Sequence, residues 1–190
     1  MDEFISQINS YHQLSPLTIE ILKGISSEKS FKKNEIILRE GDLARYYYFV
    51  KSGLLGYYTI DEGGKIIYKL FFEENSFCAS VSSIIQGIPS HFSIRALEDS
   101  EVIMYPAETF RKLISEHHDL ALFQIAYLEK NWVVKKEPLE INLKSETAKQ
   151  RYITLYQNEK LFDRLKQHEI ASYLGITPTQ LSRIRKELNL

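Results

Sequence analysis

The sequence predicts an α+β protein in which an N-terminal antiparallel β-barrel or jelly roll with flanking helices precedes a long helix and a C-terminal helix-turn-helix. Short runs rich in Ile, Val, Tyr and Phe fill residues 31–105 between glycine and acidic turns, which is typical of antiparallel strands. Helical apolar spacing follows over residues 119–136, and two short amphipathic helices separated by a glycine occupy residues 167–188. We therefore expect three segments, 1–116, 117–138 and 139–190.

The composition is that of an ordinary soluble globular protein, with 44% apolar and 26% charged residues in a chain of 190. There is no apolar run of about 18 residues, and the first residues, MDEFISQ, are acidic and polar where a signal peptide is basic and apolar. We expect a cytoplasmic protein without membrane contact. Cys78 is the only cysteine, which excludes an internal disulfide and a cysteine-held zinc or iron-sulfur site within one chain.

The charge is unevenly distributed along the chain. Residues 1–141 carry 15 Lys and Arg against 20 Asp and Glu, a net charge of −5. Residues 142–190 carry 9 against 5, a net charge of +4. A basic C-terminal segment on an acidic body is the pattern expected when only that segment contacts phosphate groups.

The N-terminal region reads as helical over residues 2–24. Ser15 is a suitable N-cap, Pro16 suits the first helical position and Gly24 is a natural stop. Six candidate strands follow, and the pair Gly63-Gly64 marks a hairpin between two of the longest. The strands are expected at residues 35–39, 46–51, 54–60, 65–72, 90–97 and 101–105.

A helix is expected at 107–115, and Asp119 can cap a longer one that runs to about Lys136. Pro138 should kink or end this helix, and a further helix is expected over about 143–157. One apolar stripe of the long helix, which we expect at a dimer interface, contains Leu120, Phe123, Tyr127 and Val134.

Lys130 interrupts that stripe, and a second apolar side contains Leu122, Ile125, Leu128 and Trp132. A helix that is apolar on two sides packs against two partners, here the barrel and the same helix of a second chain in a homodimer. The alternative is a buried helix of a single chain, with the Lys130 amine reaching outward to solvent.

Residues 167–188 have the pattern of a helix-turn-helix. Ile170, Ala171 and Leu174 recur at helical spacing, and Gly175 can take the positive φ that ends the first helix. Thr177 is an N-cap for the second helix, with Pro178 at its first position and Gln180 placed to close a capping box.

The outer face of the second helix carries hydrogen-bond donors suited to phosphates and base edges, so double-stranded DNA is the expected partner. A helical hairpin with a solvated basic face, or an adaptor that binds a protein, are the alternatives. The candidate DNA-binding residues are Thr177, Thr179, Gln180, Ser182, Arg183, Arg185 and Lys186.

This order of segments resembles the CRP/FNR superfamily of bacterial transcription regulators. The resemblance rests on Glu40-Gly41-Asp42, Gly53, the Gly63-Gly64 hairpin, Phe77, Arg95-Ala96 and the Ile170 to Arg183 series. It implies a cyclic-nucleotide-binding-like barrel, a dimerising long helix, and a dimer that reads two half-sites about one helical turn apart. It also implies RNA polymerase as a partner, an unidentified small-molecule effector, and Arg183 as a reader of guanine.

The expected effector pocket departs from relatives that bind cyclic AMP. Those relatives carry Gly-Glu two residues after the aromatic residue that opens the pocket segment, and Arg-Ser some ten residues further on. Here Ala79-Ser80 and Ser90-His91 stand at those places, so both charged contacts are missing. We expect that cyclic AMP is not the ligand. The candidate pocket residues are Phe77, Cys78, Ala79, Ser80, Ser90 and His91.

Other kinds of sensor remain as alternatives. Cys78 could respond to redox state, although its segment has no basic neighbour to lower its pKa and a buried core role is the simpler interpretation. His91, His117 and His118 could ligate haem iron, but the two adjacent histidines cannot face the same way on a helix. We expect no cofactor and no metal. No nucleophile with a nearby base or phosphate-binding loop is apparent, so we do not expect an enzyme.

Overall fold

The computed structural model describes residues 1–189, and its centre is a jelly roll of two four-stranded antiparallel sheets. The first sheet has the order β1-β8-β3-β6 and the second β2-β7-β4-β5. The strands are β1 (Ser27–Phe31), β2 (Ile36–Leu38), β3 (Tyr46–Ser52), β4 (Leu55–Ile60), β5 (Ile66–Phe72), β6 (Phe77–Cys78), β7 (Ser93–Ala96) and β8 (Ser100–Pro106).

Apolar side chains from both sheets fill the interior of the jelly roll, among them Val50, Leu55, Ile94 and Val102, which are fully buried. The six expected strands are present. Strand β1 was not predicted because four of its five residues are exposed, so it lacks the apolar alternation of a half-buried strand. Strand β6 has only two residues, too few to show a pattern.

Two short helices, α1 (Asp2–Asn9) and α2 (Pro16–Ile25), lie at the N-terminus. Ser15 caps α2 as expected, with its Oγ accepting from the Thr18 amide at 3.2 Å. The expected stop at Gly24 is wrong by one residue, because the helix continues to Ile25. Asp119 is not an N-cap; its carboxylate instead accepts from the Ser15 amide at 2.8 Å and the Thr18 hydroxyl at 3.0 Å.

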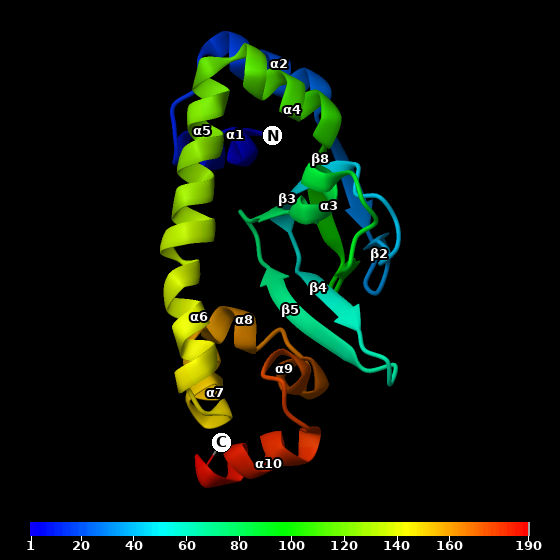
Figure 1. The fold of residues 1–190 in the computed structure, drawn as a ribbon, viewed down its shortest axis with the longest axis vertical. Coiled ribbons are helices and arrows are strands. Elements are labelled where there is room, and N and C mark those ends of the chain that lie inside the picture. Colours follow the sequence, from blue (N-terminus) through cyan, green and yellow to red (C-terminus); the bar gives the residue numbers. More distant parts are fainter. Residues whose placement is uncertain (190) are drawn as a thin grey trace.

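A long helical column runs beside the barrel for most of the height of the molecule (Figure 1). After α4 (Ala107–Glu116) it consists of α5 (His118–Leu128), a π-helical turn η1 (Glu129–Val134) and α6 (Lys136–Ser145). Of the two outcomes expected at Pro138, a kink or an end, the end does not occur, because α6 continues through it. Proline cannot donate to the carbonyl of Val134 and its ring crowds that group, and the π-helical turn that ends there absorbs the irregularity.

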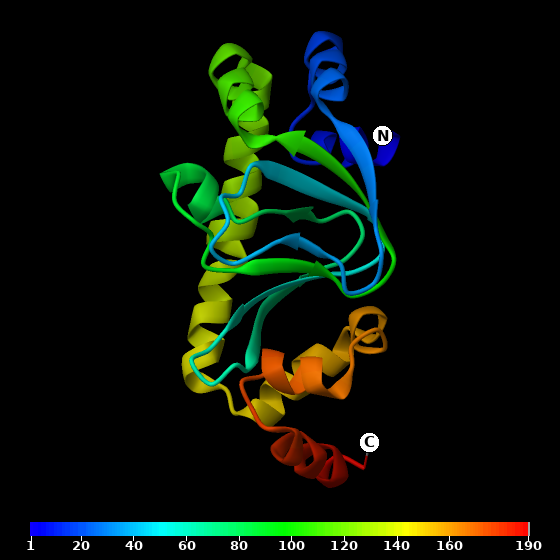
Figure 2. The same ribbon diagram turned by 90° about the vertical axis from the view of Figure 1, so that its right-hand side faces the viewer.

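The C-terminal helices are α7 (Ala148–Gln157), α8 (Glu159–Phe162), α9 (Gln167–Tyr173) and α10 (Pro178–Glu187). Thr147 caps α7 with a full capping box, so this helix starts later than the expected residue 143. The four helices gather below the second sheet, with α10 farthest from α1 and α2 (Figure 2). Within residues 1–189, no helix is long and apolar enough to cross a membrane.

Candidate nucleic-acid interface and sensor cavity

The turn between α9 and α10 has the geometry that its sequence predicts. Gly175 has a φ of 69°, which a residue with a Cβ rarely adopts. The Thr177 Oγ accepts from the Gln180 amide at 3.2 Å, while the Gln180 side-chain oxygen accepts from the Thr177 amide at 2.8 Å. The capping box therefore fixes where α10 begins, and Leu181, which is buried, fixes its inner face.

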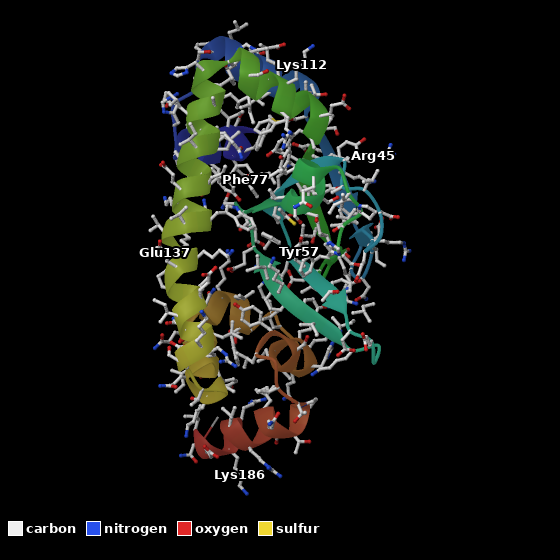
Figure 3. The ribbon with its side chains drawn as sticks, viewed as in Figure 1. Arg45, Tyr57, Phe77, Lys112, Glu137 and Lys186 are labelled. Atoms are coloured by element: carbon white, nitrogen blue, oxygen red, sulfur yellow. The ribbon has the colours of Figure 1, made fainter. Side chains whose placement is uncertain are left out.

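The outer face of α10 points away from the rest of the chain. Thr179, Ser182, Arg183 and Lys186 are all exposed, and the side chain of Lys186 projects outward from the end of the molecule (Figure 3). Thr179 and Arg183 are four residues apart and so share one helix face. This face can present hydroxyl, guanidinium and ammonium donors to a polyanion without any rearrangement of the fold.

Two members of the expected DNA-binding set have other roles in the structure, and a third is half-buried. Thr177 and Gln180 are exposed but use their side chains in the capping box. Arg185 is half-buried and its Nε is enclosed without a hydrogen-bond partner among the described residues. Burial raises the pKa of Tyr152, and the nearby Arg185 charge opposes this shift. Arg185 is therefore less accessible on α10 than Arg183, and its contact with DNA stays a prediction.

A cavity of about 60 Å³ lies between the barrel and the long helical column. Phe77, Cys78 and Ala79 line it, as expected from the sequence. Figure 3 shows Tyr57 and Phe77 among the side chains of this region. No charged side chain lines the cavity in the described part of the chain. The other walls are mainly aromatic and include Tyr47, Tyr57, Phe72, Phe123, Tyr127 and Trp132.

Ser80 and Ser90 lie behind the cavity wall and are both buried. The Ser90 hydroxyl donates to Ser80 Oγ at 2.8 Å, and the Tyr57 hydroxyl donates to the same atom at 3.3 Å. Ser80 and Ser90 thus come together as predicted, but their polar atoms bond to each other and to Tyr57 instead of facing the open space. The hydroxyls are neutral, so this group offers no ion pair to a phosphate.

His91 is exposed and lies outside the cavity wall, so its assignment to the pocket is corrected. Burial raises the pKa of the Cys78 thiol well above its ordinary value, which disfavours the reactive thiolate. Among residues 1–189, no cluster of three or more His, Cys, Asp or Glu side chains is arranged to hold a metal ion.

Of the four residues expected at a dimer interface, three pack toward the barrel and one, Val134, is exposed. Leu120 is fully buried and Phe123 nearly so, and both belong with Tyr127 to the cluster around the barrel and α1. Leu120 and Phe123 are therefore closed to a second chain in this conformation. Exposed apolar side chains outside that cluster continue into α6, and they are Ile125, Val133, Val134, Leu139 and Ile141. Leu128 and Trp132 are partly exposed but line the cavity.

Residues 28–117 match the family model described as the cyclic nucleotide-binding domain. This segment spans β1 to α4, so the barrel is the part of the chain that is similar to that family. A protein of Haemophilus influenzae described as uncharacterized is 23% identical over 105 residues, which cover 55% of this chain and 80% of that protein.

The whole described chain has the fold of transcription regulators of the CRP/FNR type. The c-di-GMP responsive global regulator CLP of Xanthomonas campestris superposes with a TM-score of 0.73 at 18% identity, covering 92% of each chain. FixK2 of Bradyrhizobium japonicum gives a TM-score of 0.72 at 19% identity, covering 87% of this chain and 85% of its own. A protein of Eubacterium rectale described as a transcriptional regulator of the crp/fnr family gives 0.68 at 18% identity, covering 93% and 84%.

Proposed function

We propose that the protein is a bacterial transcription regulator of the CRP/FNR family that binds operator DNA as a homodimer. The observation that carries the proposal is the capped helix α10 at the end of the molecule, with Thr179, Ser182, Arg183 and Lys186 exposed. The N-terminal half of such a helix enters the major groove in helix-turn-helix proteins, and Arg183 can donate two hydrogen bonds to one guanine. The net charge of +4 in residues 142–190 favours the same partner.

The exposed apolar side of α5, η1 and α6 supports dimerisation. Ile125 is 51% exposed, Val134 66% and Ile141 65%, and these residues lie along one continuous column. Exposed apolar patches of this kind mark interaction surfaces in soluble proteins. A second copy of the same column is the occupant that suits it, since a two-fold dimer also doubles the number of recognition helices. We therefore propose three parts: a sensor barrel, a dimerising column that extends to Ser145, and a DNA-binding unit after it.

The cavity supports a regulator that does not respond to cyclic AMP. A ribose-phosphate needs a cation for its phosphate, and the described cavity wall supplies only aromatic, aliphatic and uncharged polar groups. A small, uncharged and largely apolar effector fits this lining better. The side chains in and behind this wall also agree with a non-catalytic role. Burial raises the pKa of the Cys78 thiol, and the serine hydroxyls bond to one another and to Tyr57. RNA polymerase is a proposed partner on the basis of family alone.

The experiment that tests the function is selection of bound duplexes from a random DNA pool by the purified full chain, with and without cell extract. We expect a two-fold symmetric site whose half-sites are about one helical turn apart. Affinity for the selected site should fall steeply as salt increases, because neutralised phosphates release counterions. An adaptor that binds a protein would enrich no sequence and show no such salt dependence, and this result would remove the proposal.

A further inference from the structure

The C-terminal helices share a hydrophobic core with the sensor barrel. Leu54, Tyr58, Tyr68 and Leu97 of the barrel form one buried cluster with the C-terminal side chains Tyr152, Leu161, Ile170, Leu174 and Leu181. The consequence is visible in β4, where neighbours Tyr57 and Tyr58 are both buried although they face opposite sides of the strand. Tyr57 lines the cavity and Tyr58 belongs to the shared cluster.

A hydroxyl of α9 is bonded directly to the backbone of the sensor sheet. Ser172 Oγ donates to the carbonyl of Ile66 at 2.6 Å and accepts from the amide of Tyr68 at 3.1 Å. Strand β5, which carries both groups, is at the edge of its sheet. Edge strands have backbone groups that require partners, and here one side chain of the helix-turn-helix satisfies two of them. The same strand lines the cavity with Leu70 and Phe72.

Arg164, in the connection from α8 to α9, closes this interface at its edge. Its Nη1 and Nη2 donate to the two carboxylate oxygens of Glu74 at 3.0 and 2.9 Å. Its Nη2 and Nε donate to Glu98 at 2.7 and 3.1 Å. Only 17% of the Arg164 side chain is exposed, and both glutamates lie in turns of the barrel. Planar bidentate pairs of this kind fix orientation as well as add stability.

We propose that Arg164 is a latch that holds the helix-turn-helix on strand β5, so that the orientation of α10 is set directly by the sensor barrel. Because β5 also forms a wall of the cavity, the cavity and α9 belong to one rigid unit without the long column as an intermediary. The DNA part of this inference rests on the proposed function. A dimer reads two half-sites only when both recognition helices are held at a fixed spacing. The latch helps to fix that spacing, because it holds α10 in one orientation relative to the barrel.

The test measures the distance between spin labels on the full chain carrying Glu108→Cys on α4 and Gln157→Cys at the end of α7, both exposed positions. Cys78 is buried and does not compete for the label. Labelled chain is mixed with excess unlabelled chain so that distances within one chain dominate. We expect one narrow distribution for the parent and a broad or second one for Arg164→Met. Exchange of the Tyr68 amide hydrogen should become faster in the same variant.

The matched control is Lys160→Met, which removes a 67% exposed lysine that pairs with the same Glu74. It should keep the parent distribution, because exposed pairs contribute little. Arg164→Met leaves the Glu74 and Glu98 carboxylates without their arginine and could fail to fold for that reason. In that case a triple variant that combines Arg164→Met with Glu74→Gln and Glu98→Gln removes both charges, and the label distance is measured on it instead. A narrow parent-like distance in either folded variant would overturn the latch.

DNA affinity separates this inference from the proposed function. For a duplex selected from the random pool, Arg164→Met should bind between about fivefold and a hundredfold more weakly, while a random-sequence duplex should bind as before. Unchanged affinity for the selected duplex would show that the latch does not orient α10. If the parent chain selects no duplex, the proposed function fails, and the label distances still decide whether the latch exists.

Discussion

The hydroxyl of Tyr57 donates to the Oγ of Ser80 at 3.3 Å, inside the barrel and behind the cavity wall. Ser80 stands where relatives that bind cyclic AMP carry a glutamate, and its oxygen also accepts from Ser90 at 2.8 Å. The position is thus occupied by an internal network of neutral hydroxyls. A ligand hydroxyl would have to displace these bonds, and the three hydroxyls themselves offer a phosphate no ionic partner.

Cyclic AMP is therefore expected to produce no saturable heat on titration into the protein. The physical reason is that burial of a phosphate without an ionic partner leaves its desolvation cost unopposed. A small aromatic hydrocarbon serves as the comparison ligand, since apolar cavities accept such molecules. Saturable binding of cyclic AMP at micromolar concentration would contradict the interpretation of Ser80 and Ser90.

Substitution of Arg183 by alanine should weaken binding to the selected operator by about 1–3 kcal/mol and change binding to random DNA much less. A base-reading arginine loses two directed hydrogen bonds, whereas a phosphate contact contributes on every sequence. Fluorescence anisotropy with both duplexes at one salt concentration measures the difference. Arg39→Ala, which removes an exposed arginine beside β2, is the control and should leave both affinities unchanged. Equal losses on the two duplexes would show that Arg183 contacts only phosphate.

Substitution of Ile125 by glutamate should convert the dimer to a monomer at micromolar concentration. The carboxylate would be buried in an apolar interface without a partner, which costs more than the contacts it replaces. Light scattering gives the mass directly. Ile85→Glu on α3 (Val81–Gln86) is the matched control, since Ile85 is 59% exposed and lies outside the column. A monomeric parent protein, or a dimeric Ile125→Glu variant, would argue against this face.

Substitution of Gly53 by alanine should lower the free energy of unfolding by about 1–3 kcal/mol. Gly53 has a φ of 90°, and an added Cβ would lie 2.6 Å from the Asp99 carbonyl oxygen and 2.8 Å from the Ser100 Cα. Gly24→Ala is the control, because Gly24 is helical and an added Cβ there meets nothing within 4 Å. Urea unfolding should show a gain for the control and a loss for Gly53→Ala. Equal stabilities for the two variants would be evidence against strain at the β3–β4 turn.

The contribution of Glu74 to stability should disappear in acid. Burial alone would raise its pKa, but hydrogen bonds from Arg164 and Lys160 lower the pKa from the ordinary 4.5 to about 2. A carboxyl group whose pKa is lower in the folded than in the unfolded state stabilises the fold. This stabilisation is complete at pH values above the unfolded-state pKa of 4.5. That stabilisation is lost as pH falls from there through about 2. The difference in urea midpoint between the parent and Glu74→Gln should therefore shrink over this range. A difference independent of pH would exclude the ion pair as its cause.

Local rules were sufficient for the parts of the molecule that depend on neighbours in sequence. The Thr177–Gln180 capping box, the positive φ of Gly175 and the cap at Ser15 all follow from residue types and short spacing. Six of the eight strands were also apparent, because their apolar content is high. Strand β1 escaped notice because its pairing with β8 is decided by the partner strand and not by its own residues.

The errors occurred where the decisive contact is distant in the chain. Leu120 and Phe123 share a stripe with Tyr127, but only the folded barrel shows that these three residues face inward and that Ile125 is exposed. Arg185 and Arg183 are the same residue type on one helix, and only the folded structure shows that Arg183 is exposed and Arg185 half-buried. Pro138 does not end the helix, since an adjacent π-helical turn accommodates it.

The sequence by itself determined the class of fold, the boundaries of the helix-turn-helix and the absence of a charged pair at Ser80 and Ser90, because these depend on residue identity and local spacing. Tertiary structure decided which face of the long column is free, which side chains wall the cavity, and that Ser172 and Arg164 fasten the helix-turn-helix to β5 and its turns. Such contacts join residues that are far apart in sequence, and burial is a property of the assembled core that periodicity can suggest but not assign.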